Sequence, residues 1–172
     1  MSNTEEILDL VNEDDEVIDS KPRSQIYKEG LNNFRVVNVF LINSQGKIWI
    51  PRRAPNKHLF PLGLDMSMGG HVSSGESYEQ AFGRELEEEL GLKVEATTHS
   101  LLGHLTPKDG VSAFMNVYEI RSDSVPDFNK SDFVAYYWLT PAELLEKLAG
   151  GDKSKDDLPK LIKRFYSAIS SQ

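Results

Sequence analysis

The stretch that decides the fold is residues 70–92, GHVSSGESYEQAFGRELEEELGL. Within it, Ser77 followed three residues later by Gln80 forms a capping box, and Gly91 is typical of the residue that ends a helix. These signals predict a helix over 77–90. Four apolar residues fall on one of its faces and predict the buried stripe: Tyr78, Phe82, Leu86 and Leu90.

Three glutamates follow the edge of that stripe. At about 100° per residue, Glu85, Glu88 and Glu89 fall within one arc of roughly 100°. Like charges at these spacings repel by a few tenths of a kcal/mol per pair. A bound Mg²⁺ or Mn²⁺, which prefers carboxylate, carbonyl and water oxygens, would remove that repulsion. The alternative is a merely solvated acidic face, and the helix alone leaves both interpretations open.

The loop that precedes this helix favours the metal site over the solvated face. Residues 70–92 match the pattern G-x5-E-x7-R-E-U-x-E-E-x-G-U, where U is a bulky apolar residue, without a gap. This pattern is the Nudix box, and the chain is identified as a member of the Nudix hydrolase family from about Phe34 to the end of its last helix. The matching residues are Gly70, Glu76, Arg84, Glu85, Leu86, Glu88, Glu89, Gly91 and Leu92.

The resemblance implies a strand–loop–helix unit that binds Mg²⁺ (or Mn²⁺) and cleaves a diphosphate linkage by attack of water on phosphorus. It implies that Glu85, Glu88 and Glu89 are metal ligands and catalytic residues, together with the carbonyl of Gly69. It also implies that Glu76 and Arg84 form the ion pair that holds the loop against the helix. These roles suit phosphoryl transfer, which needs charge neutralised on the phosphate oxygens and a water held in line.

Many family members add a carboxylate from a later loop, as a ligand or a general base. It often lies six residues before a tryptophan, and here Asp132 stands six residues before Trp138. Asp132 is therefore a candidate catalytic residue, with Glu119 or a box glutamate as alternatives for the base. A loop cap or a solvated carboxylate is the structural alternative for Asp132.

The region ahead of the box resembles type 1 isopentenyl-diphosphate isomerases, which share the fold. Those enzymes need a cysteine two residues before a metal-binding histidine. His71 stands at the histidine position, but Gly69 replaces the cysteine and the chain has none. We therefore reject isomerisation, since the proton donor is missing. The resemblance also implies that Arg53 and Lys57 contact a diphosphate, the alternative being a solvated strand end.

Composition excludes several other classes. The chain has 172 residues, with 39% hydrophobic and 27% charged, as in a globular domain. Its net charge of −8 comes from eight acidic residues before position 20, so the rest is neutral. There is no run of basic residues that would bind nucleic acid, and no apolar stretch long enough to span a membrane. We expect a cytoplasmic protein, a monomer or homodimer, that takes a small phosphorylated, nucleotide-like substrate.

The remaining segments predict an α/β sandwich of Nudix type, with a mixed central sheet between helical layers. Residues 1–30 are expected to form a strand pair and a short helix packed on a main domain of residues 31–172. Strands are expected at 7–12, 16–19, 35–43, 47–53, 64–68, 92–105, 112–121 and 134–139, a helical turn at 24–30, and closing helices after Thr140 and over 157–169.

Two functions remain for such a chain. One is a metal-dependent hydrolase of a nucleoside diphosphate or related pyrophosphate. The other is a Nudix-fold module that binds a phosphorylated metabolite without converting it, against which the full set of box acids speaks. The loops at 54–62 and 107–111, which would read the organic part of the substrate, carry no motif that identifies it.

Overall fold

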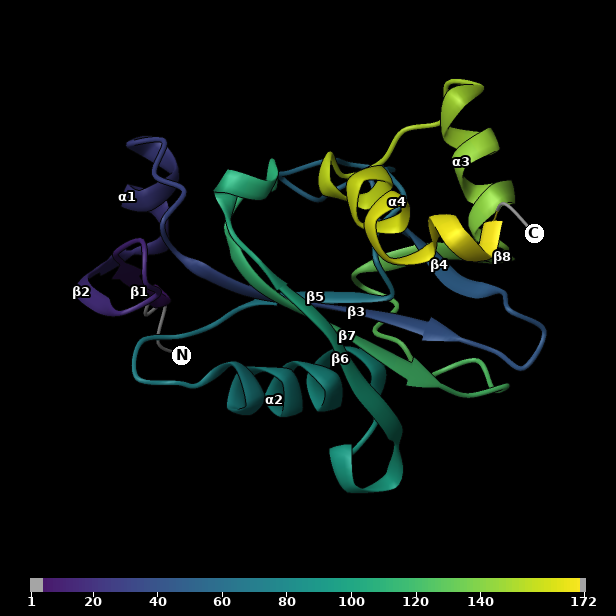
Figure 1. The fold of residues 1–172 in the computed structure, drawn as a ribbon, viewed down its shortest axis with the longest axis horizontal. Helices are drawn as coiled ribbons and strands as arrows, with labels where there is room; N and C mark the ends of the chain where they lie inside the picture. The colour runs from purple at the N-terminus through teal and green to yellow at the C-terminus, as the bar shows by residue number, and fades with distance from the viewer. Residues whose placement is uncertain (1–4, 171–172) are drawn as a thin grey trace.

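A computed structural model describes residues 5–170, and its centre is a mixed sheet in the strand order β6-β7-β3-β4-β8 (Figure 1). The parallel pair is β3 with β7, and the other pairs are antiparallel. The fifth strand, β5, pairs with the first half of β3. The strands are β3 (Arg35–Ile42), β4 (Ile48–Arg53), β5 (Met68–His71), β6 (Thr98–Leu105), β7 (Phe114–Arg121) and β8 (Phe133–Leu139).

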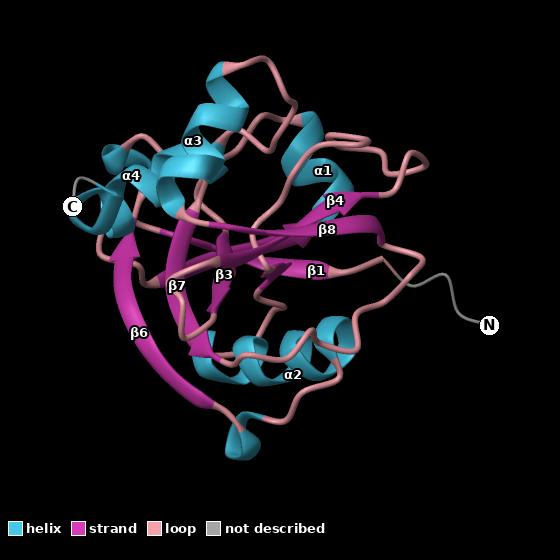
Figure 2. Cartoon of the chain, turned by 90° about the vertical axis from the view of Figure 1, so that its right-hand side faces the viewer, coloured by secondary structure: helices cyan, strands magenta, loops and turns pink. Residues whose placement is uncertain are grey.

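Helices cover both faces of this sheet, as Figure 2 shows. Because side chains alternate along a strand, Val37 and Val39 of β3 pack towards α2 (Tyr78–Leu90), whereas Phe40 packs towards the two closing helices. These are α3 (Pro141–Ala149) and α4 (Asp157–Ser170). The predicted α/β/α sandwich with a mixed sheet is confirmed.

The helix that follows the box loop is built as its sequence predicts. Ser77 accepts a hydrogen bond from the Gln80 backbone N–H, and the Gln80 side chain accepts one from the Ser77 N–H. Gly91 ends the helix in the left-handed conformation, with φ of 62°. Both ends of α2 are therefore fixed by local hydrogen bonds before tertiary packing adds to them.

Three strand predictions were wrong in their limits. The strand expected at 64–68 is β5, which begins at Met68 and runs through Gly69 and Gly70. Leu64 is instead bonded to the chain before α4, since its N–H donates to Lys153 and its carbonyl accepts from Lys155. Glycine is disfavoured inside a strand, but here Gly69 and Gly70 allow close packing beside β3.

The strand expected at 92–105 is shorter. It divides into a 3₁₀ helix, Val94–Ala96, and the strand β6, Thr98–Leu105. The Thr97 hydroxyl donates to the Val94 carbonyl and closes the 3₁₀ turn, a local bond that a hydropathy pattern does not reveal. Near the N-terminus, the second strand runs over Val17–Pro22, beyond the expected 16–19.

The N-terminal elements sit against the box loop. The strands β1 (Ile7–Val11) and β2 (Val17–Pro22) form a separate antiparallel pair, followed by α1 (Arg23–Lys28). The carboxylate of Asp9, which is 8% exposed, accepts hydrogen bonds from the Ser74 hydroxyl (2.6 Å) and the Gly75 N–H (3.0 Å). The strand pair therefore holds the loop that leads into α2.

Asp9→Ala is expected to lower the free energy of unfolding by roughly 1–3 kcal/mol, because two donors of the loop lose a buried acceptor. Chemical denaturation measures this loss. Amide hydrogen exchange should rise at Gly75, whose N–H donates to Asp9. Asp19→Ala, an exposed acid on β2, is the control, and equal losses in the two variants would contradict the role given to Asp9.

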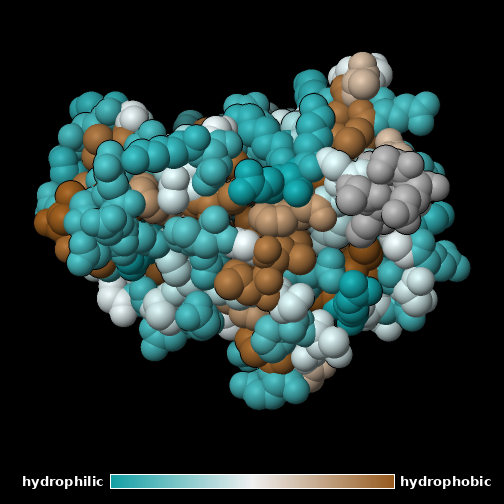
Figure 3. All heavy atoms as spheres, viewed as in Figure 1, coloured by the Kyte–Doolittle hydropathy of each residue, from teal (hydrophilic) through white to brown (hydrophobic). Residues whose placement is uncertain are grey.

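On the face shown in Figure 3 most residues are hydrophilic, and apolar residues gather near its centre over β6. Leu101 of that strand is 55% exposed. Among residues 5–170, no helix has the length and apolar character needed to span a bilayer.

Candidate active site

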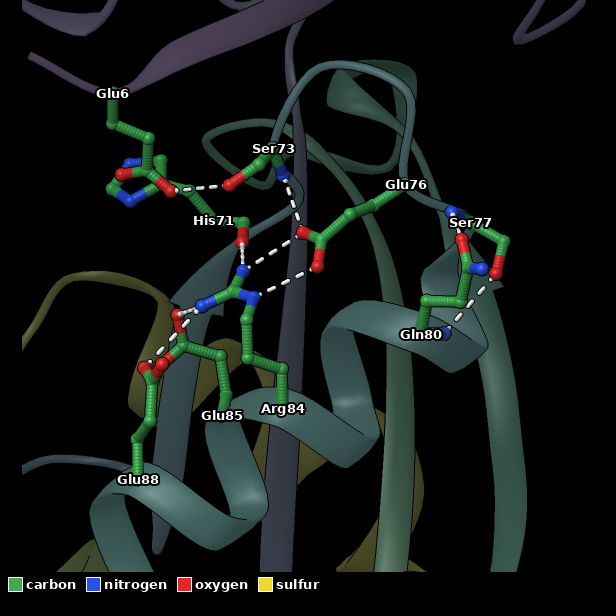
Figure 4. A network of polar contacts seen from close by, with 9 residues as sticks. All are labelled: Glu6, His71, Ser73, Glu76, Ser77, Gln80, Arg84, Glu85 and Glu88. Carbon is green, nitrogen blue, oxygen red and sulfur yellow. Dashed lines mark hydrogen bonds and ion pairs between the residues drawn. The ribbon is translucent and has the colours of Figure 1, made fainter.

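The loop and the helix of the box are joined through one guanidinium group (Figure 4). Arg84 donates two hydrogen bonds to the carboxylate of Glu76, both of 2.8 Å, and a third of 3.2 Å to the carbonyl of His71. The Arg84 guanidinium holds the pKa of Glu76 below its usual value. The paired residues thus lie where the family pattern implies, between the loop and the helix.

Glu85 packs directly on the backbone of β5. A Cβ atom at Gly70 would lie 2.3 Å from Cδ of Glu85, so only glycine admits the side chain in this position. Burial raises the pKa of Glu85, and the neighbouring Arg84, whose Nη1 lies 2.8 Å away, lowers it. The box glycine therefore positions a box carboxylate, in addition to shaping the strand.

Gly70→Ala should lower turnover by about tenfold or more with little change in stability, because the new Cβ displaces the far end of one flexible side chain. Steady-state kinetics and thermal unfolding measure the two effects. Gly46→Ala is the control for a glycine substitution. Gly46 lies in the turn between β3 and β4, away from the site, and its φ of 74° would strain an alanine there. Full activity in Gly70→Ala would contradict this placement of Glu85.

Glu89 lies on the next turn of the same helix face and reaches β5. Its Oε2 is 3.4 Å from the N–H of Gly69. Burial, together with the charges of Glu85 and Asp65, raises the pKa of Glu89 to about 8, although Lys155 acts in the opposite direction. Two neighbouring carboxylates are thus held partly out of water with few hydrogen bonds, an arrangement that favours a cation between them.

Glu88 lies apart from that pair. Its side chain is 59% exposed and its carboxylate is 3.3 Å from Nη1 of Arg84. In the described part of the chain, no three acidic or imidazole groups lie close enough to form a ready-made metal cage. Exposed side chains change rotamer within nanoseconds, so Glu88 is free to turn from Arg84 toward a cation. The donor set of Glu85 and Glu89 fits a hard divalent metal, to which Glu88 would be added.

Glu85 and Glu89 open onto a pocket of about 570 Å³. Gly69 and Gly70 line it with them. Basic side chains line it as well: Arg23, Arg53, Lys57 and Lys155. A pocket lined by both carboxylates and cations is suited to a metal-bound anion such as a diphosphate.

Two of the basic groups share one buried acid. Asp65 is 3% exposed; its Oδ2 accepts from Nη1 of Arg53 at 2.8 Å, and its Oδ1 is 3.4 Å from Nζ of Lys155. Sequence reasoning missed both Asp65 and Lys155, because they lie 90 positions apart and carry no motif. An aspartate inside the apolar run LDMSM was the available signal, since buried acids are usually paired.

The two later carboxylates take different positions. Asp132 forms a close ion pair with Lys57, which lines the pocket. Glu119 is buried and accepts a hydrogen bond of 2.7 Å from Tyr166 of α4. The structure thus places Asp132 beside Lys57, which lines the pocket together with Arg53, whereas the carboxylate of Glu119 is bonded to Tyr166.

His71 is held as a neutral hydrogen-bonding group. Its Nε2 is 2.8 Å from the hydroxyl of Tyr27 in α1. Burial, with a smaller contribution from the cations Arg23, Lys155 and Arg84, lowers the pKa of His71 to about 3. At neutral pH this histidine therefore links α1 to the box without carrying a charge.

Comparison with known proteins gives a consistent result. Residues 32–160 match the family model for the NUDIX domain. The chain is 59% identical over 94% of its length to an uncharacterized Nudix hydrolase of Nostoc sp., of which 96% is covered. It is 26% identical to an isopentenyl-diphosphate Delta-isomerase of Kocuria rhizophila, with 84% of this chain and 83% of that one covered.

A solved structure supports the same grouping. The crystal structure of DR0079 from Deinococcus radiodurans superposes with a TM-score of 0.88 at 49% sequence identity. The match covers 94% of this chain and 99% of the other.

Proposed function

The chain belongs to the Nudix hydrolase family, and on that premise we propose that it is a Mg²⁺- or Mn²⁺-dependent hydrolase of a nucleotide-like substrate. It would cleave the pyrophosphate linkage of a nucleoside di- or triphosphate, or of a related nucleoside diphosphate derivative. The observation that carries this proposal is the pair Glu85 and Glu89, half-buried side by side on Gly69 and Gly70 within a pocket lined by cations.

The metal ligands in this proposal are Glu85, Glu88 and Glu89, with the carbonyl of Gly69. When bound, the ion neutralises charge on the phosphate oxygens and lowers the pKa of a bound water. The chain's own part is to hold these oxygens in place. Glu85 is fixed by its packing on Gly70, and Glu89 by its contact with the Gly69 N–H.

Arg53, Lys57 and Lys155 bind the diphosphate. Asp65 keeps the Arg53 guanidinium in a fixed orientation, and the Leu59 carbonyl accepts a second hydrogen bond from its Nε at 3.0 Å. A preorganised guanidinium loses little conformational entropy when a phosphate binds. Lys155 adds a second positive charge beside the same aspartate. These cations would also stabilise the charge that develops on the leaving phosphate.

Asp132 is part of this proposal because its carboxylate forms an ion pair with Lys57. As a general base it would take a proton from the attacking water; as a positioning residue it would only orient Lys57. Asp132→Asn separates these roles. Loss of the acidic limb of the pH–rate profile, with a fall in kcat, is expected for a base. A rise in KM of about tenfold with an unchanged profile would contradict that role and leave positioning.

A substrate panel tests the proposed function. The measured products are nucleoside monophosphate, phosphate and pyrophosphate, with Mg²⁺ or Mn²⁺ at mildly alkaline pH. Monophosphates are included because hydrolysis of ADP-sugars, NADH and dinucleoside polyphosphates releases neither phosphate nor pyrophosphate. The panel contains nucleoside di- and triphosphates, dinucleoside polyphosphates, ADP-sugars, NADH and isopentenyl diphosphate. We expect metal-dependent release from at least one of the nucleotides. Tight binding of a compound without any product would instead support the non-catalytic binding module.

A further inference from the structure

The loop between β4 and β5 presents large apolar side chains at the pocket. Leu59 and Phe60 line the pocket, and their exposed fractions are 39% and 37%. Leu62 of the same loop is 40% exposed and lies outside the pocket wall. Exposed apolar side chains that gather beside a pocket are typical of a surface that a ligand covers. The metal and diphosphate chemistry proposed above uses neither the Leu59 nor the Phe60 side chain.

The backbone of this loop is strained at two positions. Phe60 and Leu62 have φ of 50° and 62°, left-handed values that are rare for bulky residues. The Gly63 N–H donates to the Phe60 carbonyl at 3.0 Å and closes a turn, in which Leu62 stands where glycine is usual. Such strain persists only where the surrounding structure holds it, and it is concentrated at ligand sites. The strained turn therefore indicates that the position of these side chains serves binding.

Two arginine side chains of β4 hold the loop in this conformation. Nε of Arg53 donates to the Leu59 carbonyl, and Nη1 of Arg52 donates to the Leu62 carbonyl, both at 3.0 Å. Phe60 is therefore next in sequence to a carbonyl that is bonded to Arg53, one of the groups proposed to bind the diphosphate. The organic part of a nucleotide is joined to that diphosphate, so it lies within reach of Phe60. A loop that is fixed in advance loses little conformational entropy when a ligand covers it.

We propose that Phe60 is a specificity-determining residue whose ring packs against the base of a nucleotide substrate. This inference rests on the proposed function and deepens it. The contact buries the exposed part of the ring, and it depends little on the identity of the base, since every base has a flat aromatic face. Phe60 thus favours substrates that carry a base over diphosphates that carry none, without selecting one particular base.

Binding of non-hydrolysable analogues tests this inference without catalysis. Isothermal titration in Mg²⁺ compares the α,β-methylene diphosphate of adenosine with that of ribose, which has the same diphosphate and sugar but no base. We expect wild type to bind the adenosine analogue about tenfold or more tightly. Phe60→Ala should lose most of this preference, because it weakens binding of the adenosine analogue alone. Phe60→Tyr, which keeps the ring, should retain the preference.

Leu62→Ala is the matched control, since Leu62 has a similar exposure and φ in the same loop but lies outside the pocket wall. This variant should keep the preference, and thermal unfolding checks that each variant is folded. Equal binding of the two analogues by wild type, binding of neither, a preference that persists in Phe60→Ala, or an equal loss in Leu62→Ala would overturn the inference.

The substrate panel reports separately on the proposed function. Absence of hydrolysis of every nucleotide by wild type would contradict the proposed function itself. Hydrolysis of a nucleotide by Phe60→Ala with the wild-type KM would contradict the role of Phe60 alone and leave the proposed function intact.

Discussion

Glu89→Gln is expected to lower metal-dependent turnover by at least about 10²–10³-fold while the protein stays folded. The substitution replaces the proposed carboxylate ligand with an amide of the same shape, so the proposed metal site loses charge but the helix keeps its packing. Steady-state phosphate release and circular dichroism measure the two properties. Glu87→Gln removes the same charge from an exposed position on α2 and should leave turnover unchanged.

The same variant should be more stable than the wild type in metal-free buffer. Glu89 has an ordinary pKa of 4.5 that rises to about 8 in the folded protein. The unfolded state therefore binds fewer protons than the folded state between these values, and wild-type stability falls as the pH rises through that window. Glu89→Gln removes this loss, which is on the order of a few kcal/mol at pH 8. A variant less stable than the wild type at pH 8 would contradict the burial of this charge.

Arg84→Met should lower both stability and turnover. The guanidinium of Arg84 joins Glu76, Glu85 and the His71 carbonyl, so its loss leaves several half-buried acceptors unpaired. We expect the free energy of unfolding to fall by roughly 1–3 kcal/mol at neutral pH. Arg84→Lys should recover only part of this, because an ammonium cannot make the two parallel bonds to Glu76.

The effect of Arg84 should depend on pH in a defined direction. Arg84 lowers the pKa of Glu76 from its ordinary value of 4.5. This pairing therefore stabilises the protein above about that pH, and the contribution is lost as the pH falls through the lowered value. The difference between wild type and Arg84→Met in urea denaturation should shrink in acid. Arg164→Met, at an exposed position of α4, is the control. A loss of stability in this variant as large as that in Arg84→Met would contradict the role given to the ion pair of Arg84 with Glu76.

Much of the fold follows from short-range signals in the sequence. The capping box at Ser77 and the glycine at Gly91 predicted α2, and the apolar runs predicted β3, β4, β7 and β8 within one to two residues. The predicted limits of β5 were wrong because pairing with β3 determines where β5 begins and ends, and Gly69 and Gly70 form part of that pairing. Such tertiary effects override local propensity, which is why Met68–His71 forms the strand.

The site was predictable only where its residues lie close in sequence. The box placed Glu76, Arg84, Glu85 and Glu89 on one loop and helix, and these lie together in the structure. Asp65 and Lys155 were missed because only the packing of the segment before α4 against Leu64 brings them to the pocket. A contact between distant segments leaves no periodic pattern in a single sequence.

The most direct test of the account is product release from the best nucleotide of the panel, measured with and without Mg²⁺ in wild type, Glu89→Gln and Glu87→Gln. We expect release that requires the metal, that Glu87→Gln retains and that Glu89→Gln loses. Release at the wild-type rate in Glu89→Gln, or release that persists when the metal is chelated, would contradict carboxylate-held metal catalysis at this site.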